Sequence, residues 1–98
     1  MNITKEYKET VATLNVSGRL DTTTAPALEA AISETVPTCE HLVLDFAGLE
    51  YISSAGLRVI LKAQKAMAAK NGMKLLHVNE TIMEIFEITG FSDILTIE

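Results

Sequence analysis

The stretch Leu44-Asp45-Phe46-Ala47-Gly48-Leu49-Glu50-Tyr51-Ile52-Ser53-Ser54-Ala55-Gly56-Leu57 decides the fold of this chain. An apolar segment leads into a short polar one, and two adjacent serines then open a pattern with helical spacing. Serine at a helix start commonly caps backbone N–H groups that have no partner inside the helix. The same N–H groups, together with the helix dipole, favour a phosphate. The junction is therefore either a plain helix cap or a phosphorylation switch.

Outward from this junction, the sequence predicts alternating strands and helices. The segment His41–Phe46 is apolar on both alternations, which is typical of a central strand with parallel neighbours. Helical spacing predicts one helix between Pro26 and Pro37 and another over Ser54–Lys70. The other expected elements are an N-terminal hairpin of Ile3–Tyr7 and Val11–Ser17, a strand over Lys74–Val78, a short helix from Asn79 to Gly90, and a strand over Ile94–Ile97.

The resulting order, β-β-α-β-α-β-α-β, predicts a single α/β domain over residues 1–98. We expect a mixed, mostly parallel sheet of about five strands with three helices. With 98 residues, 48% of them apolar, the chain is large enough to hold a core. Loops that leave the carboxyl ends of parallel strands meet at one sheet edge. The side chains expected at that edge are Asp21, Thr22, Thr23, Thr24, Asp45, Ser53 and Ser54.

Composition limits the partners and the compartment. A formal net charge of −5 argues against nucleic acid as the main partner, because phosphate backbones require clustered positive charge. Cys39 is the only cysteine, so no intramolecular disulfide forms, which fits a reducing cytoplasm. The first twenty residues contain no long apolar run, and we expect neither a signal peptide nor a membrane span. A cytoplasmic protein is expected.

Signals for an enzyme are weak. Nucleotide-binding glycine loops, a nucleophile elbow and a zinc-binding histidine pair are all missing from the sequence. Asp21 and Asp45 alone are a poor metal site, since two carboxylates lack further ligands. We therefore expect no enzymatic activity, no metal and no cofactor. A small phosphotransfer or hydrolytic enzyme that uses the two aspartates is the remaining alternative in this class.

The helix after the serines has two features that suggest contact with a partner. Arg58, Lys62 and Lys65 share one face through spacings of four and three, which indicates either a docking surface for an acidic partner or a solvated face. Gly56 is unfavourable in a helix by roughly 0.5–1 kcal/mol relative to alanine. Either a partner's backbone approaches closely there, or the helix packs tightly against the sheet.

These segments together resemble a known family. Leu42–Asp45 followed by Tyr51–Leu61 is similar to the signature of STAS domains, and in particular of bacterial anti-sigma factor antagonists. The turn Gly18–Asp21 and the ending Ile85–Phe91 also fit, so the resemblance spans the whole chain.

The resemblance implies a regulatory function. Such a protein binds an anti-sigma factor that is also a serine kinase, and so frees a sigma factor. Phosphorylation of one serine, which corresponds to Ser54 here, ends the binding, and a serine phosphatase restores it. The nucleotide would belong to the kinase. The chain departs from the pattern of the best-known family members at two positions. Ser53 stands where they have an aspartate, and it offers a minor alternative acceptor. Ala55 stands where they have a serine or threonine.

The same resemblance and the basic stripe together suggest a partner surface. It would comprise Asp21, Thr22, Thr23, Ser53, Ala55, Gly56, Arg58 and Lys62. Family members also serve as accessory subunits of lipid-transport ATPases, where they dock on the nucleotide-binding subunit. The missing aspartate before Ser54 gives this alternative some support.

Overall fold

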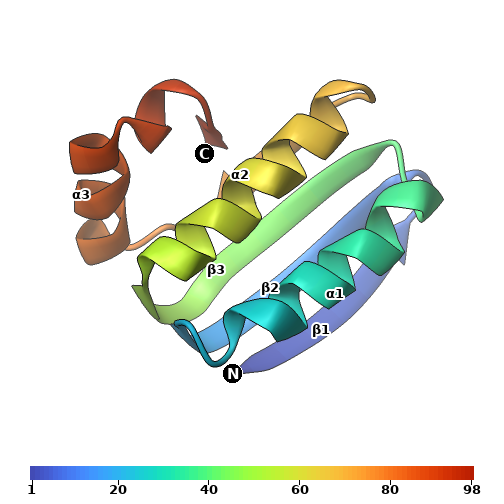
Figure 1. Cartoon of the computed structure of the whole chain (residues 1–98). Coiled ribbons are helices and arrows are strands. Elements are labelled where there is room, and N and C mark those ends of the chain that lie inside the picture. The colour runs from blue at the N-terminus through green and yellow to red at the C-terminus, as the bar shows by residue number, and fades with distance from the viewer.

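A mixed five-stranded sheet forms the base of the molecule, and helices cover one of its faces (Figure 1). The computed structural model describes residues 1–98. The strands are β1 (Asn2–Lys8), β2 (Val11–Leu20), β3 (His41–Ile52), β4 (Met73–Leu76) and β5 (Thr96–Ile97). The helices are α1 (Ala25–Thr35), α2 (Ser54–Ala68) and α3 (Glu80–Thr89), with short 3-10 turns η1 (Val36–Thr38) and η2 (Phe91–Asp93).

The strands lie in the sheet in chain order, from β1 to β5. The hairpin strands β1 and β2 are antiparallel, and every other neighbouring pair is parallel. Leu44 in β3 pairs with Leu14 on one side and Leu75 on the other, so β3 is the central strand. The predicted element order and the mostly parallel sheet are confirmed.

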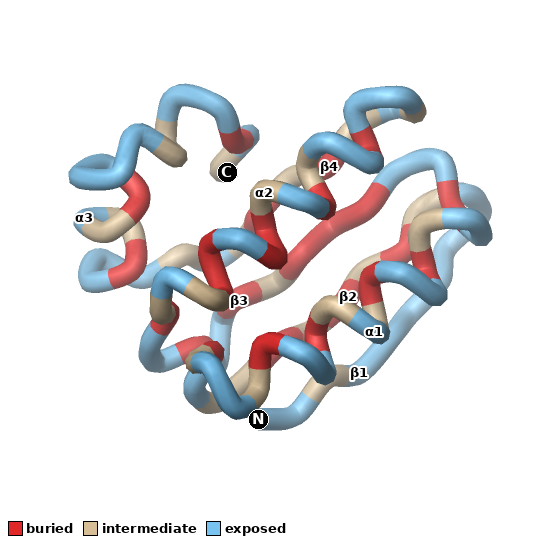
Figure 2. The backbone as a smooth tube through the Cα atoms, in the orientation of Figure 1, coloured by how far each residue is buried: buried red, intermediate tan, exposed pale blue.

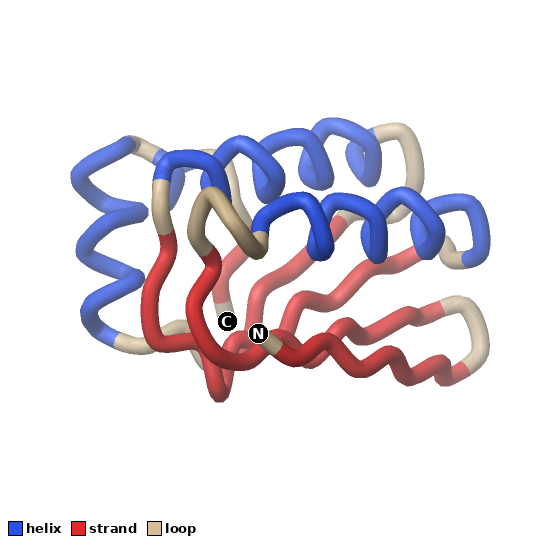
Figure 3. Tube along the Cα trace, turned by 60° about the horizontal axis from the view of Figure 1, so that its bottom comes forward, coloured by secondary structure: helices blue, strands red, loops and turns tan.

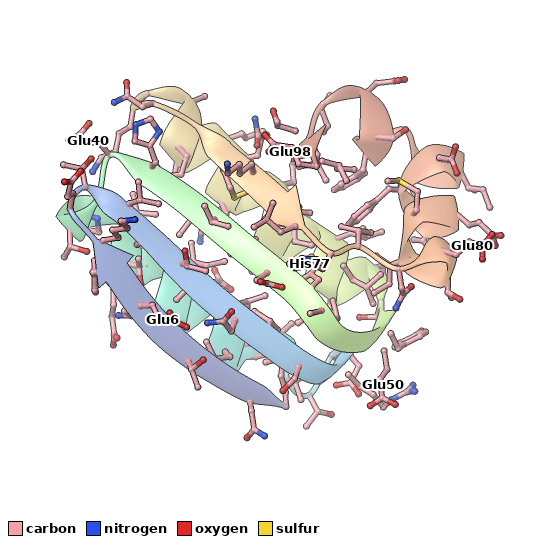
Figure 4. The ribbon with its side chains drawn as sticks, turned by 180° about the vertical axis from the view of Figure 1, so that it is seen from behind. Glu6, Glu40, Glu50, His77, Glu80 and Glu98 are labelled. Atoms are coloured by element: carbon pink, nitrogen blue, oxygen red, sulfur yellow. The ribbon has the colours of Figure 1, made fainter.

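The core lies between the sheet and the helices. Figure 3 shows α1 and α2 side by side over one face, with α3 standing at the end of the sheet. Figure 2 shows the buried residues gathered on the inner sides of these elements. The largest fully buried side chains are Leu14, Leu20, Leu28, Leu42, Leu44, Phe46, Leu49, Ile60, Met67, Leu75, Ile82 and Phe86. The opposite sheet face carries no helix, as the view from behind shows (Figure 4).

Two strands run further than the sequence predicts. The expected loop after Phe46 is the second half of β3, which continues to Ile52, and the expected turn at Gly18 lies within β2. Register shifts between Asn15 and Ser17 and between Gly18 and Arg19 interrupt the simple alternation. Such bulges move the buried positions out of a strict period of two, so the pattern no longer looks like a strand. Because both strands are longer than expected, β2 and β3 end side by side, with Leu20 paired to Ile52.

The end of the chain differs in a smaller way. The expected strand over Ile94–Ile97 is reduced to β5, because η2 and Leu95 first turn the chain back toward the core. Gly90 ends α3 in the left-handed conformation with φ 82°, and the Phe91 ring stacks on Phe86 at a centroid distance of 6.3 Å. The end of the helix at Gly90 agrees with the prediction, and the apolar contact of Phe91 often accompanies such an ending. None of the helices combines the length and apolar character needed to cross a membrane.

Candidate functional site

The site is the edge of the sheet where β2 and β3 end. Leu20 pairs with Ile52, so the two chains leave the sheet next to each other. The backbone N–H of Ser53 donates to the carbonyl of Leu20 at 2.8 Å, which ties the start of α2 to the loop before α1. In Figure 1 this loop and the first turn of α2 lie at the same end of the molecule. The predicted neighbourhood of Asp21 and the two serines is therefore present.

Ser53 caps α2. Its backbone is extended, with φ −100° and ψ 175°, and its Oγ accepts a hydrogen bond from the N–H of Gly56 at 3.4 Å. This arrangement satisfies one of the N–H groups that a helix leaves without a partner in its first turn. Ser53 is only half-exposed, and its hydroxyl is engaged by the cap.

Ser54 is the first residue of α2 and is exposed. The capping bond uses Ser53, which leaves the Ser54 hydroxyl free of that role. A negative group attached there would lie in the positive potential of the helix N-terminus. The geometry therefore permits a bulky anionic modification of Ser54 without displacing the core.

Asp21 organises the loop between β2 and α1. Its Oδ1 accepts hydrogen bonds from the N–H groups of Thr23 at 3.0 Å and Thr24 at 3.1 Å. The hydroxyl of Thr24 donates to the carbonyl of Arg19 at 2.7 Å. The Thr24 N–H, assisted by the Thr23 N–H and the Thr24 hydroxyl, lowers the pKa of Asp21 below its usual value, against the opposing effect of desolvation. A charged Asp21 thus holds Thr22 and Thr23 exposed at the edge.

Gly56 points into the molecule and does not belong to the exposed surface. A Cβ atom at this position would lie 2.6 Å from Cγ of Leu20 and 2.9 Å from Cγ1 of Ile52. Gly56 is buried, and the first turn of α2 packs directly on the ends of β2 and β3. Of the two explanations for this glycine, the structure favours tight packing, and we remove Gly56 from the candidate contact surface.

Asp45 lies away from this edge, which corrects the expected cluster. It pairs with Asn15 and Leu76 in the middle of the sheet, seven residues before Ile52. Its Oδ1 lies 3.0 Å from Nδ1 of His77 and also accepts from the N–H of Ala47 at 3.0 Å. The reason is the length of β3, which carries the chain on past Asp45 before the loop begins.

Asp45 and His77 form a separate pair on the back of the sheet, where Figure 4 shows His77. Desolvation raises the pKa of Asp45, but the hydrogen bonds from His77 and Ala47 outweigh it and leave that pKa below the usual value. No group of three or more histidine, cysteine, aspartate or glutamate side chains is close enough to hold a metal ion. Asp45 is thus engaged by His77 on the back of the sheet, whereas Asp21 lies in the loop after β2.

A groove of about 360 Å³ lies between the start of α1 and the first half of α2, and Ala55, the residue after Ser54, lines it. Arg58 and Lys62 lie on its α2 side, and Lys62 Nζ is 2.7 Å from Oε1 of Glu29. The residues that line it are Thr22, Ala25, Pro26, Glu29, Ala55, Arg58, Val59 and Lys62. Four of these, Thr22, Ala55, Arg58 and Lys62, were expected from the sequence.

The other four groove residues come from the packing of α1 against α2, which has no local signature in the sequence. Ala25, Pro26 and Glu29 are contributed by α1. A second feature of the edge was also missed: the Arg19 guanidinium lies over the Tyr51 ring, 4.3 Å from its centroid. Only the paired register of β2 and β3 reveals that these two residues are neighbours.

Comparison with known proteins agrees with this architecture. The family model described as the STAS domain matches residues 2–98. The chain therefore belongs to the STAS domain family.

Individual relatives narrow this assignment. The anti-sigma-B factor antagonist of Listeria monocytogenes is 34% identical over 104 residues, which cover 100% of this chain and 90% of that protein. The anti-sigma F factor antagonist of Paenibacillus polymyxa is 30% identical over 100 residues, 99% of this chain and 86% of that protein. A crystal structure of an anti-sigma factor antagonist from Mycobacterium paratuberculosis superimposes with a TM-score of 0.90 at 26% identity, covering 98% of this chain and 83% of that one. These similarities place the chain among the bacterial STAS anti-sigma factor antagonists.

Proposed function

We propose that this protein is a phosphorylation-controlled binding switch. It binds an anti-sigma factor that is also a serine kinase, so that the sigma factor held by that kinase is released. Phosphorylation of Ser54 ends the binding, and a serine phosphatase reverses it. We propose further that the protein acts in the cytoplasm and has no catalytic activity of its own. The observation that carries the proposal is the exposed Ser54 at the first position of α2, next to Ala55 of the groove and to the loop that follows Leu20.

The geometry favours Ser54 over Ser53 as the acceptor. A kinase must reach the hydroxyl oxygen, and Ser54 is exposed whereas Ser53 is partly covered. The Ser53 hydroxyl also accepts the N–H of Gly56, so its modification would remove the cap of α2. Ser53 is thus the minor alternative.

The partner surface that we propose combines the Asp21 loop with the groove. Thr22 and Thr23 project from the loop, and Ala55, Arg58 and Lys62 line the groove on α2. The exposed cations suit an acidic surface on the kinase. A phosphoserine adds about −1.5 to −2 charge at pH 7, so it would repel that acidic surface from the centre of the contact.

The acceptor is tested by incubating the protein with its cognate kinase and ATP and mapping the phosphate by mass spectrometry. We expect the phosphate on Ser54 in the unaltered protein. Ser54→Ala should abolish most of the incorporation, whereas Ser53→Ala should retain it. Modification elsewhere, with Ser54 untouched, would remove the assignment.

The switch is tested by measuring affinity for the same kinase. We expect Ser54→Asp to bind at least about tenfold less tightly, a change of about 1.4 kcal/mol. Thr81→Asp is the matched control, because it also places a carboxylate in the first turn of an exposed helix, α3, but outside the proposed surface. Equal affinity of Ser54→Asp and the control would contradict the switch.

A second candidate is the role of accessory subunit in a lipid-transport ATPase. Ser53 at the position where the family has an aspartate is the observation in its favour. The same binding assay, run against the nucleotide-binding subunit of such a transporter, separates the two candidates. Binding to that subunit that is insensitive to Ser54→Asp would favour the transporter role over the switch.

A further inference from the structure

Arg58 lies one helical turn after Ser54, on the same face of α2. Residues four positions apart on a helix are neighbours, and helical side chains lean toward the N-terminus of their helix. An arginine at position 58 is therefore within reach of the turn that holds Ser54 and Ala55. In agreement, Arg58 and Ala55 line the same groove, together with Thr22 from the neighbouring loop.

Arg58 also has no ion-pair partner within the chain. The ion pairs of the protein are Lys62–Glu29, Lys74–Glu98 and His77–Asp45, and Arg58 takes part in none of them. Two of the neighbouring charged groups, Asp21 and Arg19, already have partners within the chain. Asp21 is bound by the N–H groups of its own loop, and Arg19 stacks on Tyr51. The exposed guanidinium of Arg58 has no anionic partner in the chain, so it is available to an anion that is introduced nearby.

We propose that Arg58 has two alternative partners and is the positioning residue of the switch. In the unmodified protein it extends into the groove and pairs with an acidic group of the kinase. After modification it turns to the phosphate on Ser54, which leaves the groove without its cation. This inference rests on the proposed function, in which Ser54 is the acceptor.

The chemistry of the two groups supports such an exchange. A phosphate monoester presents three acceptor oxygens and nearly two negative charges, and the planar guanidinium binds such a group through two parallel N–H donors. The pairing has a low entropic cost because helix α2 already holds both residues on one face. Phosphorylation would thus act twice, by adding a repulsive charge and by removing an attractive one.

Lys62 and Lys65 do not replace Arg58 in this role. Lys62 lies eight positions after Ser54, and its Nζ is 2.7 Å from Oε1 of Glu29 in α1, so it already has an anionic partner. Lys65 is exposed on α2 but lies eleven positions after Ser54, which corresponds to about 16 Å along the helix axis. Lys65 is therefore a suitable control, being a cation on the same helix and beyond the reach of the phosphate.

The first experiment requires no kinase. Phosphoserine is introduced at position 54 by genetic code expansion, and the phosphate is titrated by ³¹P NMR in three backgrounds: unaltered, Arg58→Gln and Lys65→Gln. A guanidinium beside the phosphate stabilises the dianion and lowers its second pKa. We expect that pKa to be about 0.3 unit higher in Arg58→Gln than in the unaltered background, the size of one helical ion pair. Lys65→Gln should leave it unchanged, and equal values in all three backgrounds would overturn the proposal.

The second experiment is a cycle of affinities for the kinase, with and without phosphoserine at position 54. Arg58→Gln should weaken binding of the unmodified protein about fivefold, as expected for one exposed charged contact. The loss of affinity caused by phosphorylation should then be about fivefold smaller in Arg58→Gln than in the unaltered background. Independent, additive effects of the two changes would overturn the exchange of partners.

The two experiments separate this inference from the proposed function. If the unaltered protein fails to bind the kinase, the proposed function is wrong, and the NMR titration still decides whether Arg58 pairs with the phosphate. If the unaltered protein binds and phosphorylation ends the binding, but Arg58→Gln changes neither measurement, only the role of Arg58 is wrong. Circular dichroism of Arg58→Gln establishes that the variant is folded.

Discussion

At the scale of single residues, Gly56 occupies a position with no room for a side chain. A Cβ there would approach Leu20 Cγ to 2.6 Å and Ile52 Cγ1 to 2.9 Å, distances that real atoms do not reach without a shift of the backbone or the neighbours. Two effects oppose each other in Gly56→Ala. The helix gains up to about 1 kcal/mol from alanine, while overpacking costs about 1–3 kcal/mol.

We expect Gly56→Ala to lower the free energy of unfolding by about 1–2 kcal/mol in urea titrations. Truncation of Leu20 makes room for the added methyl group, so the effects of Gly56→Ala and Leu20→Ala should not add. The double variant should be more stable than the sum of the two single losses indicates. Strict additivity would show that the contact with Leu20 is not the cause.

The two serines should differ in their contribution to stability. Ser53→Ala removes the cap of α2 and should lower the free energy of unfolding by about 0.5–1 kcal/mol, since the capping bond of 3.4 Å is long. Ser54→Ala should change the free energy of unfolding by less than about 0.5 kcal/mol, because it removes only an exposed hydroxyl that does not form the capping bond. Urea unfolding of both variants measures this difference. A larger effect of Ser54→Ala would show that Ser54 has a structural role.

At the scale of elements, the β2–α1 loop depends on the charge of Asp21. The pKa of Asp21 is lowered in the folded protein, so this carboxylate contributes stability above its usual pKa near 3.8, and that contribution is lost as the pH falls through the lowered value. We expect Asp21→Asn, which keeps an acceptor oxygen but no charge, to be less stable than the unaltered protein at pH 7. The difference should disappear in strong acid.

Thermal unfolding at a series of pH values checks this expectation. Asp21→Ala is the matched variant, because it removes the acceptor as well as the charge and should remain destabilised at every pH. A constant difference between Asp21→Asn and the unaltered protein across the acid range would show that the carboxylate charge does not hold the loop.

The sequence predicts the type and order of the elements better than their ends. A serine cap at the start of α2, the stop at Gly90 and the strand around Leu44 each have a local chemical signature, and each is confirmed. The extension of β3 to Ile52 has none, because it depends on bulges in its pairing with β2. Asp45 was wrongly expected at the edge of the sheet because β3 was expected to end at Phe46.

The buried face of α2 shows a similar limit. Its spacing predicts an inner stripe that includes Gln64 and Ala68, but Ala68 is exposed, while Ala63 and Met67 are buried instead. The stripe is rotated because α2 packs against α1 as well as against the sheet, and both neighbours are distant in sequence. The groove that Ala55 and Arg58 line is a product of the same packing.

At the scale of the whole molecule, charge is unevenly distributed. The protein has a formal net charge of −5, yet Arg58, Lys62 and Lys65 make the outer face of α2 positive. The helix α3, at the end of the sheet, carries Glu80, Glu84 and Glu87 and no cation. A partner that approaches α2 at close range therefore meets a field of opposite sign to the net charge.

Ionic strength decides which of these two fields governs association with the kinase. At low salt the Debye length is comparable to the width of the α2 face, and it shrinks to a few ångströms in about 0.5 M salt. If the acidic surface of the kinase meets the α2 cations, their attraction accelerates encounter, and the association rate constant should fall several-fold from about 50 mM to about 500 mM NaCl. Dissociation should change less, because the contacts are already formed.

Stopped-flow measurements give both rate constants, and Lys65→Gln should reduce the salt dependence of the association rate constant. A rate that rises with salt would mean that net repulsion between two acidic proteins dominates, so that the basic face of α2 does not lead the encounter.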